Sequence, residues 1–394
     1  MLTAASYVEL VGKYPRAAGA ALYVQRAFGV RSLTFLTAFA VMSSGLTSAG
    51  AASRGFAAYF AELVAGLLSA PALLVAILFL LGLGALNWRG VEESVKANVA
   101  LTFIELAGLL IVIAVGALAL AGGAGDPGRA LGFATGDPFA RVVGGAGLAF
   151  FALVGFEDSV NMAEETTDPQ RAFPRALFWG VTITGVVYML VAFFTAAVVP
   201  LETLAASESD LLEVIRVGAA WFPLWVFALI SMCAVTNSAL INLMMASRLL
   251  FGMARERIVP SAFARVHAAR RTPWVAIVFT TALVIGLASW GGVRELGGTT
   301  ALLLLCVFTL VNAAVLVLRR RPVAHAHYRA PILFPVLGVV TSAYLASPLA
   351  GRDVRQYRIA GVLLLVGIAL WLVNWAVHER RGRARSQAYR PPGS

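Results

Sequence analysis

Ten apolar runs of at least sixteen residues follow one another along the chain, and they restrict its fold more than any other feature. A helix of about 20 apolar residues crosses a bilayer core of about 30 Å. Only 13% of the 394 residues are charged, against about 25% in ordinary soluble domains. The runs are continuous and do not alternate with a period of two, which excludes a β-barrel. The sequence therefore predicts an all-α polytopic membrane protein, with ten full spans over residues 33–59, 72–87, 99–121, 142–163, 176–199, 222–250, 275–290, 301–318, 332–349 and 359–377.

The distribution of basic residues predicts the orientation of these spans. A formal net charge of +11 could indicate nucleic-acid binding, but the basic residues lie mainly in loops between spans. Of the 31 Lys and Arg residues, 23 lie on one side of the predicted membrane, seven on the other, and Arg54 within a span. Cytoplasmic loops carry such an excess. We therefore expect a cytoplasmic basic tail at residues 378–394 that contacts membrane lipids, and no nucleic-acid partner.

The first eleven residues are apolar but too short to span a membrane. As a helix they would rise only about 16 Å, which is about half of a bilayer. They are followed by Lys13, Tyr14 and Pro15 on the side expected to be cytoplasmic. An interfacial segment or a signal-peptide remnant is the alternative, although no basic leader precedes the segment and no small-residue cleavage site follows it. We interpret residues 1–11 as the end of a helix whose beginning is missing.

The span over residues 142–163 combines a glycine-rich stretch with two carboxylates in mid-membrane, Glu157 and Asp158. Acidic residues inside a membrane cost about 2.5–3.5 kcal/mol each and usually face a cavity or a partner. Gly155 stands directly before them, where a helix could unwind and free its backbone groups, and such interrupted helices hold substrates at the midplane of many transporters. The pattern predicts an interrupted helix at a binding site. The alternative is a continuous helix whose acids lie nearer the cytoplasmic interface.

Glu105 is a second acidic residue within a span, flanked by Ile104 and Leu106 and without a basic neighbour in sequence. A carboxyl group removed from water can exchange a proton near physiological pH. Glu105 is therefore a candidate proton relay. A structural glutamate, hydrogen-bonded between helices, remains the alternative.

Two further rows of polar residues are each spaced to share one face of a predicted span. Such residues could bind a substrate, although small hydroxyl residues also simply permit close packing of helices. Phe150 and Phe151 are core residues by default, but their position at the break makes one of them a candidate lid over a ligand. The two rows are Ser43, Ser44, Thr47 and Ser48, and Asn237 or Ser238 with Asn242.

Motifs for other chemistries are missing from the sequence. No Gly-x-x-x-x-Gly-Lys-Ser/Thr loop is present, which argues against direct ATP-driven transport. The four His residues lie in basic loops or the tail without a His-Glu-x-x-His motif, so a zinc peptidase is unsupported and no metal site is expected. A membrane-embedded enzyme is disfavoured, because no metal, phosphate or nucleophile constellation accompanies the buried acids.

Three segments of the chain, taken together, resemble the amino acid–polyamine–organocation (APC) superfamily of permeases. They occur in order and cover nearly the whole chain. The segments are Ser6-Tyr7-Val8-Glu9-Leu10 with Tyr14-Pro15-Arg16 and Val24-Gln25-Arg26, then Gly155-Phe156-Glu157 with residues 163–171 and Pro174-Arg175-Ala176, and finally residues 246–256 with Pro260 and Thr272-Pro273-Trp274.

The resemblance implies a leucine-transporter-like fold of two inverted five-helix repeats plus two C-terminal helices, with cytoplasmic termini and alternating access to a central site. Residues 1–394 would form one transmembrane permease domain, in which residues 1–11 end the second helix and residues 33–377 hold helices three to twelve. In the family, unwound parts of the first and sixth helices hold the carboxylate and amine of an amino acid. The positions of this chain that match the substrate site are Phe151, at the aromatic gate, Ala152, Val154 and Gly155, with Phe150 and Phe156 beside them, Ser43, Ser44 and Ser48 on the third helix, and Asn242 on the eighth.

The chain departs from the family pattern at two places. The first helix, with its glycine-rich carboxylate-binding turn, is missing, which suggests a misassigned start codon or a truncated product. Many proton-coupled relatives carry a Lys at the position that resembles Glu105. An acid there keeps proton coupling possible with a changed sign, or contacts the amine of a cationic substrate.

These observations predict a secondary transporter that carries amino acids across the cytoplasmic membrane. We expect coupling to protons through Glu105 and Glu157, no cofactor and no enzymatic activity. An ion-independent exchanger of amino acids or polyamines, or an inactive truncated permease, is the alternative.

Overall fold

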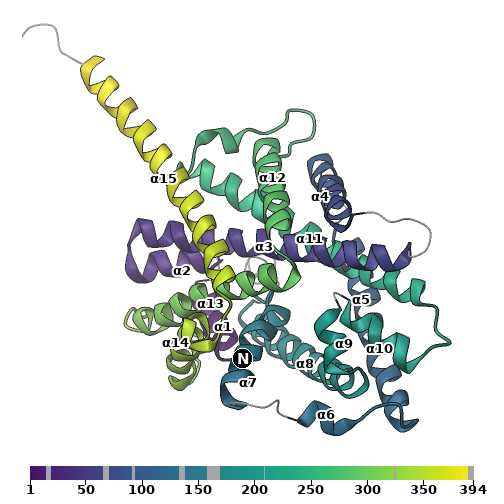
Figure 1. Cartoon of the computed structure of the whole chain (residues 1–394). Helices are drawn as coiled ribbons and strands as arrows, with labels where there is room; N and C mark the ends of the chain where they lie inside the picture. Colours follow the sequence, from purple (N-terminus) through teal and green to yellow (C-terminus); the bar gives the residue numbers. More distant parts are fainter. Residues whose placement is uncertain are drawn as a thin grey trace, which may run out of the picture.

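The computed structural model describes residues 1–14, 19–64, 71–90, 94–132, 138–157, 169–207, 209–323 and 325–388. All regular secondary structure within these ranges is helical (Figure 1). The α-helices are α1 (Leu2–Lys13), α2 (Gly19–Phe28), α3 (Arg31–Leu63), α4 (Ala72–Arg89), α5 (Ser94–Ala121), α6 (Pro127–Leu131), α7 (Pro138–Ala149), α8 (Pro169–Val198), α9 (Leu201–Ala206), α10 (Asp210–Gly218), α11 (Leu224–Arg255), α12 (Trp274–Trp290), α13 (Val293–Leu318), α14 (Leu333–Ala346) and α15 (Val354–Ala388). Short 3₁₀ helices occupy η1 (Phe150–Leu153), η3 (Ser261–Ala264) and η4 (Pro348–Ala350).

The predicted all-α polytopic membrane fold is confirmed. Within the described residues, seven helices are long and apolar enough to cross a membrane, namely α3, α4, α5, α8, α11, α13 and α15. The other three predicted spans correspond to shorter apolar helices: α7 continued by η1, α12 and α14. Within the predicted span over residues 142–163 the helix ends at Leu153, and residues 158–163 lie outside the described part of the chain.

The long helix α3 lies at the centre of the bundle, where it packs against α11 and α13 and crosses most of the molecule (Figure 1). It has 33 residues and few large side chains in its buried middle, which is made largely of Ser, Ala and Gly. Small residues let helices approach closely in a membrane, where lipid removes the usual hydrophobic drive for association. At Gly50 a methyl group would come within 3.1 Å of Leu296 Cδ1 on α13.

The helix α1 is buried on all sides, and it packs against α8, α13 and α14. Its helical conformation was predicted, and its position inside the bundle does not fit an interfacial segment. The ring of Tyr7 packs edge-on against Phe156 and Phe308, with centroid distances of 5.9 and 5.7 Å. Ser6 donates a 2.6 Å hydrogen bond to the amide oxygen of Asn312 on α13.

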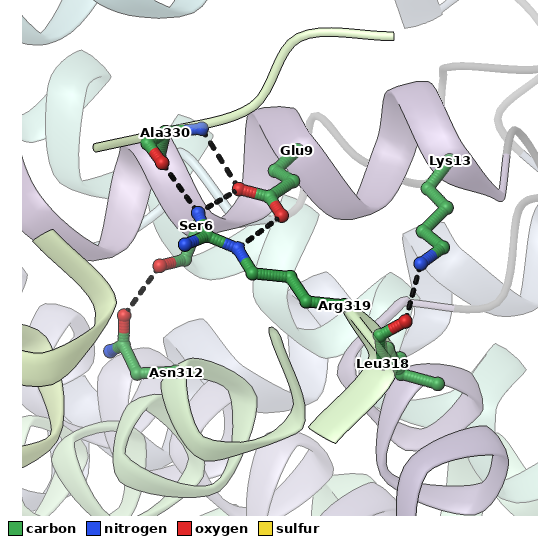
Figure 2. Close-up of polar contacts among 7 residues, drawn as sticks. All are labelled: Ser6, Glu9, Lys13, Asn312, Leu318, Arg319 and Ala330. Atoms are coloured by element: carbon green, nitrogen blue, oxygen red, sulfur yellow. Dashed lines mark hydrogen bonds and ion pairs between the residues drawn. The ribbon is translucent and has the colours of Figure 1, made fainter. Parts of the chain in front are cut away.

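A buried ion pair fixes the C-terminal half of α1 to the end of α13 (Figure 2). Arg319 Nε and Nη2 donate to the two Glu9 oxygens at 2.8 and 2.6 Å, and the Ala330 N–H donates to Glu9 at 2.8 Å. The hydrogen bond with Glu9 raises the pKa of Arg319. Lys13 donates to the carbonyl of Leu318, one of the last carbonyls of α13. Both charges of the pair are therefore hydrogen-bonded as well as paired.

We expect Glu9→Gln to lower the free energy of unfolding by about 3 kcal/mol, because it leaves Arg319 buried without a counter-charge. The Glu9 side chain is only 2% exposed. Unfolding of the purified protein in detergent, followed by heat or denaturant, measures the effect. In the exposed pair of Glu62 with Arg216, where the side chains are 35% and 45% exposed, Glu62→Gln is the matched control and should cost at most about 1 kcal/mol. Equal losses for the two variants would contradict this account.

Candidate functional site

The helix α7 stops in the middle of its predicted span. After η1 the chain becomes extended at Val154, and Gly155 follows with φ +120°, a conformation that L side chains rarely adopt. The Gly155 N–H donates a 2.9 Å hydrogen bond to Glu157 Oε2, so the carboxylate satisfies a backbone group that the interruption frees. The helix therefore ends at the place where the sequence predicts an interruption. Glu157 is 7% exposed, and Asp158 lies outside the described residues.

A cavity of about 320 Å³ lies beside this break. Its walls come from α3, the segment of η1 and the following turn, α5, α8, α11 and α13, so it is formed by helices from most of the chain. Nine of the twelve site residues named from the sequence line it, namely Ser44, Ser48, Glu105, Phe151, Ala152, Val154, Gly155, Glu157 and Asn242.

Three of the named residues lie outside this cavity. Phe150 packs on Phe308 at a centroid distance of 5.6 Å, and Phe156 packs on the same ring at 5.3 Å. Ser43 is fully buried, and its hydroxyl has no hydrogen-bond partner within the described residues. One step along a helix turns a side chain by about 100°, which is why Ser43 and Ser44 have different surroundings. Phe156 also lines a separate cavity of about 460 Å³ between the break and α8.

Phe151 forms the wall of the cavity toward α13. Its ring packs directly on Gly297, where a methyl group would come within 2.9 Å of Phe151 Cδ1. The absence of a side chain at Gly297 is thus what allows the ring to pack on α13.

The polar lining of the cavity is acidic. It contains two carboxylates, Glu105 and Glu157, whereas no Lys, Arg or His of the described residues lines it. Glu105 forms no hydrogen bond or ion pair with another described residue. Because the Glu105 carboxylate is partly removed from water in this lining, the arrangement suits a ligand with a cationic group, a proton, or both.

Comparison with known proteins agrees with this geometry. A family model described as amino acid permease matches residues 1–373. The chain belongs to this family. Its resemblance to the APC permeases is therefore confirmed, and it is an integral, multi-pass membrane protein of a family of transporters, not of enzymes.

Curated relatives of this permease carry names for several substrates. The branched-chain amino acid permease BcaP of Bacillus subtilis is 24% identical over 96% of this chain and 84% of its own length. The methylthioribose transporter of B. subtilis is 26% identical over 86% of this chain and 76% of its own length. Cationic amino acid transporter 9, chloroplastic, of Arabidopsis thaliana is 28% identical over 68% of this chain and 49% of its own length.

Sequence reasoning missed two polar residues of the permease cavity, Tyr188 on α8 and Thr300 on α13. Thr300 Oγ1 lies 2.7 Å from Thr47 Oγ1 and donates to the Ser44 carbonyl at 3.2 Å, which ties α13 to α3 at the cavity. The one feature of the sequence that could have indicated Tyr188 and Thr300 is a polar side chain inside or at the edge of an apolar run, as for Glu105. That signal does not show which helix face is turned inward.

We expect Ser48→Leu to raise the KM of transport at least about tenfold, because the larger side chain occupies part of the cavity. The fold should persist, since the added carbons enter empty space and not a packed core. Concentration-dependent uptake and thermal unfolding together measure this. Ser32→Leu adds the same side chain at an exposed position of the same helix and should leave KM unchanged; a similar KM for both variants would place the substrate elsewhere.

Proposed function

We propose that this permease carries amino acids across the cytoplasmic membrane by alternating access to the cavity beside the break, driven by the proton gradient. The interrupted helix is the observation that carries the proposal. Residues 151, 152, 154, 155 and 157 of the interrupted stretch line a cavity formed by six parts of the chain. In lipid, irregular backbone is tolerated only where it is buried in protein or lines a polar cavity.

The break also suggests how the substrate would be oriented. The C-terminal end of α7 carries the negative end of the helix dipole, which favours a positive group such as the ammonium of an amino acid. In the proposal, backbone groups of residues 152–155 bind the charged main chain of the substrate. Phe151 acts as the gate, because its ring lies between the cavity and Gly297 of α13. Hydroxyl and amide groups of Ser44, Ser48 and Asn242 contact the remainder of the substrate.

Glu105 and Glu157 are the residues proposed for proton coupling. Both line the cavity, where Glu157 accepts the Gly155 N–H, and no Lys, Arg or His of the described residues lines the cavity beside Glu105. A carboxylate in such a place is stabilised by taking up a proton or by contacting the ammonium of the substrate. Uptake of a proton by Glu105 while the substrate is bound in the cavity, and release of both at the other face, would couple the two fluxes in the same direction.

The orientation proposed for the chain follows from its charges. The ends of α1 and α13 that carry Lys13 and Arg319 would lie at the cytoplasm, as would the C-terminus. The loop between α14 and α15 would then lie on the opposite face.

Proteoliposomes test the transport proposal directly. We expect uptake of at least one radiolabelled amino acid above empty liposomes, with accumulation that increases when an inward proton gradient is imposed. The panel should contain branched-chain and cationic amino acids and a polyamine. Counterflow without a gradient, combined with no response to the gradient, would favour ion-independent exchange. Uptake of no amino acid under either condition would contradict the proposal.

Glu105→Gln separates coupling from binding. We expect the variant to lose gradient-driven accumulation but to keep counterflow of the substrate, because glutamine cannot carry a proton between the two faces. Both assays use the same vesicles. Glu202→Gln, at an exposed position in the short helix α9, is the control and should behave as the unaltered protein. Full gradient-driven accumulation by Glu105→Gln would show that another group carries the proton.

A further inference from the structure

One arginine, Arg352, joins four backbone or side-chain oxygens from different parts of the bundle. It lies between η4 and the start of α15. Its Nη2 donates to the carbonyl of Gly147 on α7 at 2.9 Å, and its Nη1 donates to the carbonyl of Gly298 on α13 at 3.0 Å. Nη1 also donates to Gln356 Oε1 at 2.9 Å, and Nε donates to the carbonyl of Leu345 on α14. The planar guanidinium presents its donors in a fixed fork, so a single side chain reaches three helices at once.

The charged residues next to Arg352 in the sequence bind other groups. Asp353 accepts the backbone N–H of Arg355 at 2.8 Å, and Arg355 pairs with Glu295 at 3.5 Å. Arg352 forms no ion pair with a carboxylate of the described residues. Its hydrogen bonds are therefore to neutral oxygens, which hold a guanidinium without the strength of a buried ion pair.

Two adjacent glycines of α13 make this arrangement possible. A methyl group on Gly298 would come within 2.2 Å of Gln356 Nε2, and one on Gly297 would meet the ring of Phe151. Gln356, which is 6% exposed, can therefore lie directly on the α13 backbone and hold the guanidinium in place. The same short stretch of α13 contacts the Phe151 ring, Gln356 and Arg352.

The contact with Gly147 connects this cluster to the break. Gly147 precedes Phe151 by one helical turn, on the helix that leads into the break. The connection continues along α7, because a methyl group on Gly144 would lie 3.5 Å from the Ala350 carbonyl in η4. The segment that enters the cavity is thus attached to α13 at two points, through the Phe151 ring on Gly297 and through Arg352.

We propose that Arg352 is a positioning residue for transport, which holds α7 against α13 and thereby closes the cavity toward the end of the bundle where α14 meets α15. The proposal rests on the alternating-access function above. Release of the guanidinium from the Gly147 carbonyl frees α7 to move away from α13, and the Phe151 ring moves with it. Because the acceptors are neutral oxygens, the guanidinium can exchange them for water without leaving an opposite charge buried alone, so this closure is reversible.

The test measures access to the cavity and needs no substrate. It uses Ser48→Cys in a protein whose two free cysteines are removed by Cys233→Ser and Cys306→Ser. The rate of labelling by a membrane-impermeant maleimide is measured in sealed vesicles, with the reagent applied at the face that carries the α14–α15 loop. We expect Arg352→Gln to raise the labelling rate about tenfold, because the open arrangement is then populated more often.

Arg355→Gln is the matched control, since it removes the same charge from an exposed arginine three residues away. It should leave the labelling rate unchanged. Gln356→Ala keeps the guanidinium of Arg352 but removes the side-chain oxygen that holds it. This variant should also raise the labelling rate, by a smaller factor. It keeps the proposal testable where Arg352→Gln does not fold. Equal labelling of Arg352→Gln and Arg355→Gln, or a loss of thermal stability without faster labelling, would overturn the proposal. Failure of amino acid uptake alone would contradict the proposed function and leave this result intact.

Discussion

The bilayer sets the constraint on which the rest of this structure depends. Inside lipid, each backbone N–H and C=O group needs a partner within the protein, so a helix that stops in mid-membrane requires special surroundings. The break after α7 meets this need in two ways, because Glu157 accepts the Gly155 N–H and the freed segment lines a polar cavity. The packing of α3, α11 and α13 follows from the same need, since these helices enclose that cavity.

Two arginines at opposite ends of the bundle illustrate different ways of holding helices together. Arg319 is paired with the buried Glu9, an arrangement that is costly to separate because either charge would be left without its partner. Among the described residues, the Arg352 guanidinium instead donates only to neutral oxygens, which can be exchanged for water without leaving an opposite charge buried alone. The first contact suits a fixed joint between α1 and α13. The second suits a joint between parts that separate during a transport cycle.

The sequence predicted much of the fold, because membrane thickness imposes a length on every span and glycine with buried acids indicates a break. It predicted the inner walls less completely. Which faces of α8 and α13 turn inward depends on packing, so Tyr188 and Thr300 could not be recognised. The rotation of one residue along α3 decides that Ser44 lines the cavity and Ser43 does not. The contacts of Arg352 leave even less trace in the sequence, since most of its partners are backbone carbonyls that every residue possesses.

The length of α3 has a mechanical consequence. At 1.5 Å per residue its 33 residues extend about 50 Å, well beyond a hydrocarbon core of about 30 Å, so the helix is tilted or protrudes from the membrane. Its central residue is Thr47, and the cavity residues Ser44 and Ser48 lie on either side of it. When a rod rocks about its middle, the ends sweep wide arcs while the middle hardly moves. In the proposed alternating-access cycle, Ser44 and Ser48 would therefore lie where α3 moves least, so that a bound substrate would keep the same neighbours while those at the two ends of the helix change.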